Sequence, residues 1–243
     1  MRNNAQSSEA DMKLSQREKQ IMEILKQKRY SSVKSLAKAT YISQSSIRRD
    51  LAHLEALGLV ERSYGGVSIS GSESEVPHLN ARITKNLRAK RKIAQKAIRF
   101  VKDGMTVLLD GSTTAYQLVD LLAAKKNITL ITNATYTAQR AIEKGITVYL
   151  TGGRSEGGSP VLTGSYAEEM LERINADVVF FSSMALTDEG VVCDCTESEN
   201  KIRRIMLCRA KTRILLMDKS KIGKSAQHVL CTLNELTAMI TED

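Results

Sequence analysis

Apolar residues recur at helical spacing in three consecutive segments near the start of the chain. The first segment, 14–28, opens with Ser15 and Glu18 at the spacing of a capping box. The second runs over about 33–39, and Ser43 is a plausible N-cap for the third. Two short strands around a Gly-Gly turn follow. Three helices and a hairpin within about sixty residues predict a winged helix-turn-helix.

Beyond residue 100 the pattern changes to short apolar runs separated by amphipathic segments. The runs that predict strands are 105–109, 128–131, 147–150, 178–181, 214–217 and 238–240. The segments that predict helices are 115–124, 135–143, 166–174 and 198–210, after a basic helix at about 80–101. Such alternation is typical of a mostly parallel sheet that helices cover on both faces.

The predicted fold class is therefore α/β, with an N-terminal winged helix-turn-helix domain joined to a mostly parallel, doubly wound α/β domain. We expect the first domain at 12–70 and the second at 80–243. The segment between them, 71–79, is polar and rich in Ser and Glu in most of its length, so it is the expected linker.

Composition narrows the class of protein. Hydrophobic residues make up 42% of the 243 residues and charged residues 26%, which is typical of an ordinary folded chain. No apolar run approaches the about 18 residues that cross a membrane, and the polar first residues do not resemble a secretory signal. Four cysteines are too few for a disulfide framework, so a cytoplasmic location without a membrane partner is expected.

The net charge of +9 is concentrated in the first hundred residues. Residues 12–70 hold 11 Lys and Arg against 5 Asp and Glu, and residues 81–102 hold 9 basic residues and no acidic one. Residues 103–243 hold 15 basic and 18 acidic residues. This asymmetry indicates a polyanionic partner for the front of the chain.

The third helix has the pattern of a DNA recognition helix. At about 100° per residue, one face carries Ile47, Leu51, Leu54 and Leu57, which we expect to be buried. Arg48 and Arg49 lie away from that face and in the N-terminal half, the part of such a helix that enters the major groove. Asp50 lies near the buried margin, so a structural ion pair is expected there rather than a base contact. The residues expected to contact operator DNA are Ser43, Gln44, Ser45, Arg48, Arg49, Arg62 and Tyr64.

These residues also resemble a known family. The string from Ser43 to Leu51, Ser-Gln-Ser-Ser-Ile-Arg-Arg-Asp-Leu, followed by the Gly65-Gly66 turn, resembles the DNA-binding segment of DeoR-type bacterial transcriptional regulators. Ser46 stands where that family usually has Thr, and Tyr64 stands where it usually has His before the two glycines. The resemblance covers 12–69 and implies a double-stranded operator as partner.

The loop after the strand at 105–109 is a candidate anion site. Asp110-Gly111-Ser112-Thr113-Thr114 offers small hydroxyl residues and backbone N–H groups at the start of a helix, where the helix dipole favours a negative charge. The loop has neither the ending of a nucleotide P-loop nor a Gly-x-Gly-x-x-Gly turn, so ATP and NAD are poorly supported and no cofactor is expected. A single phosphate ester fits better, although an ordinary capped helix start remains the alternative.

Other loops should meet the first one, since ligands of open α/β sheets bind at the carboxyl ends of the strands. Lys221 could neutralise a phosphate, and Asp110 or Asp218 could accept sugar hydroxyls. The residues expected to bind the effector are Asp110, Ser112, Thr113, Thr114, Asn133, Gly152, Gly153, Thr196, Arg203 and Lys221.

The second half, over 90–241, resembles the C-terminal sensor domain of the same DeoR-type regulators, which is similar in fold to phosphosugar isomerases. The resemblance implies that Ser112, Thr113 and Thr114 hold an effector phosphate and that Lys221 lies at the same pocket. Arg203 stands where the family more often has Lys, and 182–186 lacks the family's glycines. The leading hypothesis is a regulator, a repressor of a carbohydrate-catabolism operon, that acts as a homodimer or homotetramer and responds to a phosphorylated sugar.

Two other functions stay open at this point. The second domain could be an active isomerase or deaminase, in which Asp110, Asp194 or Glu197 would serve as the base. It could also be an adaptor whose pocket is vestigial. Metal binding is not expected, because the four cysteines and three histidines lack the spacing of a zinc site.

Overall fold

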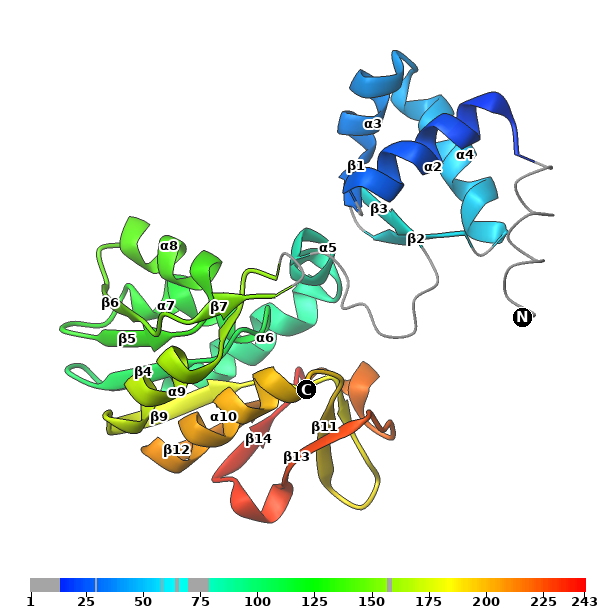
Figure 1. The fold of residues 1–243 in the computed structure, drawn as a ribbon. Helices are drawn as coiled ribbons and strands as arrows, with labels where there is room; N and C mark the ends of the chain where they lie inside the picture. The colour runs from blue at the N-terminus through cyan, green and yellow to red at the C-terminus, as the bar shows by residue number, and fades with distance from the viewer. Residues whose placement is uncertain (1–13, 29, 58, 64–65, 70–78, 157–158) are drawn as a thin grey trace. The chain divides into compact units, whose positions relative to one another are not determined.

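A computed structural model describes residues 14–28, 30–57, 59–63, 66–69, 79–156 and 159–243 (Figure 1). The chain divides into two compact units, Met1–Lys85 and Asn86–Asp243. The expected linker at 71–79 lies outside the described residues apart from Leu79.

The first unit has the outline that the sequence predicts. Its helices are α2 (Gln16–Lys28), α3 (Val33–Thr40) and α4 (Gln44–Ala56). Its strands β1 (Tyr30–Ser32), β2 (Val60–Ser63) and β3 (Gly66–Ile69) form an antiparallel sheet in the order β1-β3-β2. The fully buried side chains include Ile21, Leu25, Leu36, Ile47, Leu51 and Leu54. This arrangement confirms the predicted winged helix-turn-helix.

The capping box before α2 is confirmed. The Ser15 amide donates to Glu18 Oε2 at 2.8 Å, and the Glu18 amide donates to Ser15 Oγ at 3.2 Å. The other carboxylate oxygen of Glu18 lies 2.6 Å from Nδ1 of His53 on α4. Burial by itself would raise the pKa of Glu18, but the hydrogen bonds with His53 and Ser15 lower it below its usual value. Glu18 therefore caps one helix and joins it to another.

Strand β1 was not predicted, because three residues between two helices are too short to show an alternation of apolar and polar positions. It pairs with β3 from Tyr30↔Ser68 to Ser32↔Gly66. At Gly66 a Cβ atom would lie 2.3 Å from the hydroxyl oxygen of Tyr30. Only glycine allows β3 to approach the Tyr30 ring this closely.

The second unit is built on a six-stranded parallel sheet in the order β14-β12-β9-β4-β5-β6. The strands are β4 (Thr106–Leu109), β5 (Thr129–Thr132), β6 (Thr147–Leu150), β9 (Ala176–Phe181), β12 (Ala210–Leu216) and β14 (Ala238–Ile240). Each matches a predicted apolar run, so the predicted mostly parallel α/β class is confirmed. Two small antiparallel sheets, one of three strands and one of two, were not predicted.

Helices cover both faces of this sheet, as Figure 1 shows. Val178 and Phe180 of β9 enter one buried cluster with α6 (Leu87–Ala97), η2 (Ala115–Leu118) and α7 (Val119–Leu122). Val179 and Phe181 enter the opposite cluster with α9 (Ser165–Glu172) and α10 (Glu197–Arg209). The alternation along one strand explains why these strands are apolar at nearly every position.

The basic helix expected at 80–101 is not continuous, which corrects that prediction. The structure has α5 (Leu79–Thr84), then α6, then a short 3-10 turn η1 (Ile98–Phe100). Asn86 separates α5 from α6 with a φ of 54°, in the left-handed region that Asn tolerates better than most residues. Helical periodicity continues through such a single residue, so the sequence pattern did not reveal it. The helix expected at 115–124 likewise begins as the 3-10 turn η2.

Helix α8 (Thr135–Glu143) and the isolated pair β7 (Arg154–Ser155) and β8 (Leu162–Thr163) complete the region around β5 and β6. Strands β10 (Ala185–Leu186), β11 (Val191–Asp194) and β13 (His228–Thr232) form the second small sheet. Within the described parts of the chain, no helix is both long and apolar enough to cross a membrane.

Candidate DNA-binding and effector sites

Helix α4 presents its polar N-terminal half to solvent. Ser43 is its N-cap, and its hydroxyl accepts the Ser46 amide at 3.3 Å. Ile47, Leu51 and Leu54 are fully buried, as the helical spacing predicted, whereas Leu57 is 40% exposed. Ser43, Gln44, Ser45, Arg48 and Arg49 are all exposed.

Asp50 has the structural role that the sequence indicated. Its two carboxylate oxygens accept from Nε and Nη2 of Arg17 on α2, at 2.6 and 2.5 Å. This bidentate pair fixes the orientation of α4 against α2. By contrast, Arg48 Nη2 donates only a long hydrogen bond, 3.4 Å, to Gln44 Oε1 one turn earlier. Arg48 and Arg49 are thus exposed on α4, whereas Arg17 is bound to Asp50.

Two of the expected DNA contacts cannot be placed. Arg62 belongs to β2, but its side chain lies outside the described residues, and so does the whole of Tyr64. The wing contact expected from this hairpin stays a prediction.

In the second unit, the loop after β4 is a buried turn held by Asp110. One oxygen of Asp110 accepts the Ser112 amide at 3.1 Å, and the other lies within reach of the Ser182 amide at 3.4 Å, after β9. Ser112 Oγ accepts the amide of Ala115, the first residue of η2, at 3.1 Å. The N-cap residue of η2 is Thr114, and its side chain makes no capping hydrogen bond.

The Arg203 guanidinium binds three carboxylates and the side-chain oxygen of Asn200. Its guanidinium donates to Asp110 at 2.9 Å, Asp194 at 3.1 Å and Glu199 at 2.9 Å. The Arg203 side chain is only 4% exposed. Burial by itself would lower the pKa of Arg203, but the three carboxylates raise it above its usual value. Arg203 and Asp110 therefore hold β4 against α10. Their ion pair lies at the edge of the sheet where the effector is expected to bind.

A second polar group lies at the same sheet edge and involves two residues that sequence reasoning missed. Lys90 of α6 is buried, and its Nζ donates to Thr113 Oγ1 at 3.0 Å. Asn86, one turn earlier, donates through Nδ2 to Asp218 Oδ1 at 3.0 Å and to Ser220 Oγ at 3.1 Å. The N-terminal end of α6 is thus tied to the loops after β4 and β12.

Lys221 completes this group. Its Nζ donates to the Ser183 carbonyl at 2.8 Å and to Ser182 Oγ at 3.2 Å, and lies 3.9 Å from Asp218 Oδ2. Burial would raise the pKa of Asp218, but the Ser220 hydroxyl and the Lys221 charge lower it below its usual value. Asp218 is therefore a carboxylate between cationic and hydroxyl groups.

One signal could have identified Lys90 from the sequence. In the basic segment 81–102, Lys90 falls on the apolar stripe with Ile93, Ala94 and Ala97, where a lysine is out of place unless it has a partner. Asn86 gave no comparable signal, because the helical periodicity continues on both sides of it.

The loops after β5 and β6 also turn toward this edge. Asn133 is 2% exposed and donates through Nδ2 to the Leu162 carbonyl at 2.9 Å. Its Oδ1 is buried and lacks a hydrogen-bond partner among the described residues. Gly153 has a φ of 102°, and a Cβ there would lie 2.5 Å from the Thr163 carbonyl oxygen, so this position requires glycine. Asn133 Oδ1 is thus a buried acceptor whose hydrogen-bonding capacity is not used by the described residues.

The predicted effector residues do not all converge equally. Asp110, Ser112, Thr113, Thr114 and Asn133 are all nearly or fully buried. Thr196 is the N-cap residue of α10 and its side chain makes no capping hydrogen bond.

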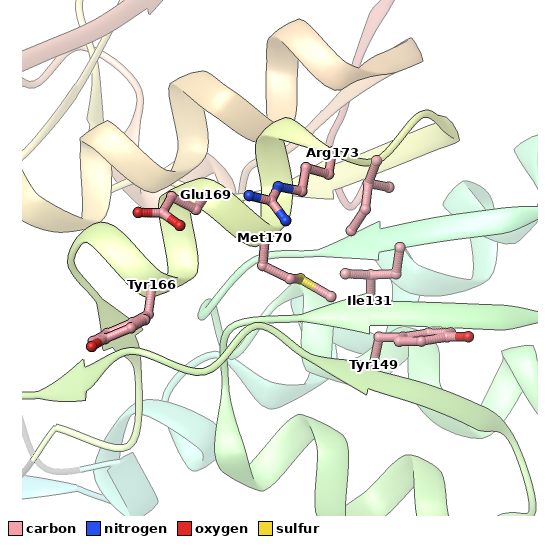
Figure 2. Close-up of a pocket in the computed structure, with 7 residues that line it drawn as sticks. Ile131, Tyr149, Tyr166, Glu169, Met170 and Arg173 are labelled. Carbon is pink, nitrogen blue, oxygen red and sulfur yellow. The ribbon is translucent and has the colours of Figure 1, made fainter.

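A cavity of about 500 Å³ lies away from these residues, between α9 and strands β5 and β6 (Figure 2). The described residues also hold no group of three or more Cys, His, Asp or Glu that could bind a metal ion.

Comparison with known proteins accounts for both units. Residues 17–73 match the DeoR-like helix-turn-helix domain, and residues 85–243 match the DeoR C terminal sensor domain. The HTH-type transcriptional regulator GolR of Listeria innocua serovar 6a is 31% identical over 229 residues, covering 94% of this chain and 90% of that protein.

A second relative is named as the repressor of a sugar phosphotransferase system. The lactose phosphotransferase system repressor of Staphylococcus aureus strain N315 is 32% identical over 209 residues, covering 83% of this chain and 81% of that protein. A ribose 5-phosphate isomerase from Methanocaldococcus jannaschii covers 56% of this chain and 55% of its own at 18% identity, with a TM-score of 0.43. The two domain matches and the full-length relatives show that the chain belongs to the DeoR family of helix-turn-helix transcriptional regulators.

Proposed function

We propose that this protein is a transcriptional repressor of a carbohydrate-catabolism operon and that a phosphorylated sugar modulates its affinity for operator DNA. It acts in the cytoplasm as a homodimer or homotetramer, without catalytic activity. The observation that carries the effector site is the buried Lys90 Nζ, which donates to Thr113 in a loop of hydroxyl residues. Lys221 supplies a second cation at the same sheet edge.

The phosphate of the effector binds beside Lys90 and the Thr113 hydroxyl. A phosphate accepts charge-assisted hydrogen bonds from an ammonium, which are about twice as strong as bonds between neutral groups. Thr113 and the loop amides then donate to the phosphate, while the free Oδ1 of Asn133 accepts from a sugar hydroxyl. Asp110 and Arg203 hold the loop in position through their ion pair.

The signal leaves the site through α6. Lys90 donates its amide to the Asn86 carbonyl at 3.0 Å, so the two residues belong to one helical turn. Asn86 is also the first residue of the second unit, and Lys85 the last of the first. A shift of Lys90 toward a phosphate therefore disturbs the Asn86–Asp218 hydrogen bond at the junction. A coupling of about 1–3 kcal/mol, the usual range, changes operator affinity by about 5- to 150-fold.

Catalysis is the weaker hypothesis because of how the carboxylates are used. Asp110 and Asp194 are both paired with Arg203, and Asp194 also accepts from the Ser183 hydroxyl at 3.1 Å. Neither is poised to remove a proton from a substrate. Glu197 is exposed at the start of α10.

To test the proposal, DNA that binds the protein would first be selected from a pool of random sequences. Fluorescence anisotropy would measure the affinity of the full chain for that DNA while a panel of sugar phosphates, including ribose 5-phosphate and glucosamine 6-phosphate, is titrated. At least one should shift the affinity, and inorganic phosphate alone should act weakly. Turnover of a sugar phosphate by the pure protein, or indifference to the whole panel, would contradict the proposal.

Substitutions at Thr113 connect the effect to the site. Thr113→Val removes the hydroxyl and should leave DNA binding intact but resistant to the sugar phosphate. Thr113→Ser is the matched control, because it keeps the hydroxyl that faces Lys90, and it should respond as the unmodified protein does.

A further inference from the structure

We propose that the groove between α9 and strands β5 and β6 is a docking surface for a second copy of this chain, related to the first by a twofold axis. The inference gives the proposed homo-oligomer a specific surface. It does not depend on the effector, so either can fail while the other holds.

The groove lies where the helical cover of one sheet face runs out. Ile131 of β5 and Tyr149 of β6 are partners in the parallel register, so they point to the same face. Nearer the centre of the sheet that face is closed by α9 and α10, and Ile131 is 3% exposed. Tyr149, on the edge strand, is 55% exposed. The open volume is about 500 Å³.

Apolar and aromatic side chains line this space from both sides. In Figure 2, Met170 extends from α9 toward Ile131 and Tyr149. Tyr166, at the start of α9, also lines the groove and is 78% exposed. Tyr and Met are enriched at protein–protein interfaces, and an apolar groove between two exposed tyrosines is typical of an interaction site.

The charges on the groove indicate what fills it. Glu169 of α9 and Arg173, the C-cap residue of α9, both line it, and both are exposed. Across the described residues, neither forms an ion pair, although Glu and Arg four positions apart on a helix commonly do. The surface thus offers one negative and one positive charge flanking an apolar centre.

Such a pattern is complementary to itself. A twofold axis through the groove brings Glu169 opposite the partner subunit's Arg173, and Arg173 opposite the partner subunit's Glu169, while the tyrosines and Met170 bury one another. A small ligand would need fixed polar groups inside the cavity to orient it, whereas the polar groups here lie on exposed positions. A second copy is therefore the occupant that uses every feature of the groove.

Sedimentation velocity on the full chain, without DNA or effector, would test this surface. The unmodified chain should associate in a concentration-dependent way. Tyr149→Glu places a charge in the buried centre and should weaken association by about 30-fold or more, the loss expected at an interface hot spot. The matched control is Val229→Glu, on β13, since Val229 is 52% exposed and does not line the groove.

Reversing the charges of Glu169 and Arg173 tests the surface without disturbing the fold, because both side chains are exposed. Glu169→Arg and Arg173→Glu should each weaken association, and the double variant should recover it, since opposite charges again face each other across the axis. A monomeric unmodified chain at all concentrations would overturn the proposal. So would a Tyr149→Glu variant that associates normally, or a double reversal that stays as weak as the single ones.

Discussion

Arg203 gives the sharpest test of how the sensor unit is held together. Replacing it with methionine keeps a long side chain but leaves Asp110, Asp194 and Glu199 without their shared cation. Breaking a buried ion pair by removing one partner costs about 3–5 kcal/mol. Because the Arg203 side chain is 4% exposed and the Asp110 side chain 1%, water cannot replace the lost contacts without local opening.

The expected loss converts into a measurable temperature. For a domain of about 150–250 residues, 1 kcal/mol corresponds to about 2–4 °C in Tm, so Arg203→Met should lower the Tm of the sensor unit by about 6–20 °C. Differential scanning calorimetry at neutral pH would measure it. The unfolding of the DNA-binding unit should not change, since none of these ion pairs involves it.

Arg203→Lys serves as the control for charge. A lysine keeps one positive charge but lacks the planar guanidinium that reaches three carboxylates. The Tm of Arg203→Lys should therefore fall between those of the unmodified chain and of Arg203→Met. If Arg203→Met unfolded at the same temperature as the unmodified chain, the three carboxylates would not need Arg203. Its assignment as a structural residue rather than an effector contact would then be refuted.

Four further outcomes follow from the same structure. Arg48→Ala should abolish discrimination between selected and random DNA in a competition gel shift, while thermal stabilisation by the sugar phosphate persists. Asn86→Gly keeps the left-handed backbone but loses the amide, so the effector should still bind and its effect on DNA affinity should shrink in anisotropy titrations. The pKa of Glu18 is lower in the folded than in the unfolded state. Its contribution to stability is therefore present above about pH 4.3 and is lost as the pH falls through the folded pKa. Glu18→Gln should make the Tm depend less on pH over this range in thermal melts. Burial raises the pKa of Cys231 to about 12, so a thiol reagent at mildly alkaline pH should modify exposed Cys208 first and Cys231 only on unfolding, which mass spectrometry can follow.

The sequence by itself determined the elements that depend on local periodicity. The four strands β4, β5, β9 and β12 are apolar on both faces because helices cover both, and that pattern is visible without coordinates. The buried face of α4 follows from helical spacing around Ile47, and Asp50 stood out as an acid at its margin. These features depend on neighbours within a turn or a strand.

The tertiary structure decided which distant groups become partners. Arg203 and Asp110 are 93 positions apart, and Asn86 and Asp218 are 132 apart, so no spacing rule connects them. The parallel sheet brings all its strand ends to one edge, and only there do Lys90, Thr113 and Lys221 meet the same group of loops. The break between α5 and α6 at Asn86 is a local feature, but it was also hidden, since one left-handed residue leaves the helical periodicity on either side intact. Periodicity reports which face of an element is buried, whereas pairing across the fold depends on where those faces are packed.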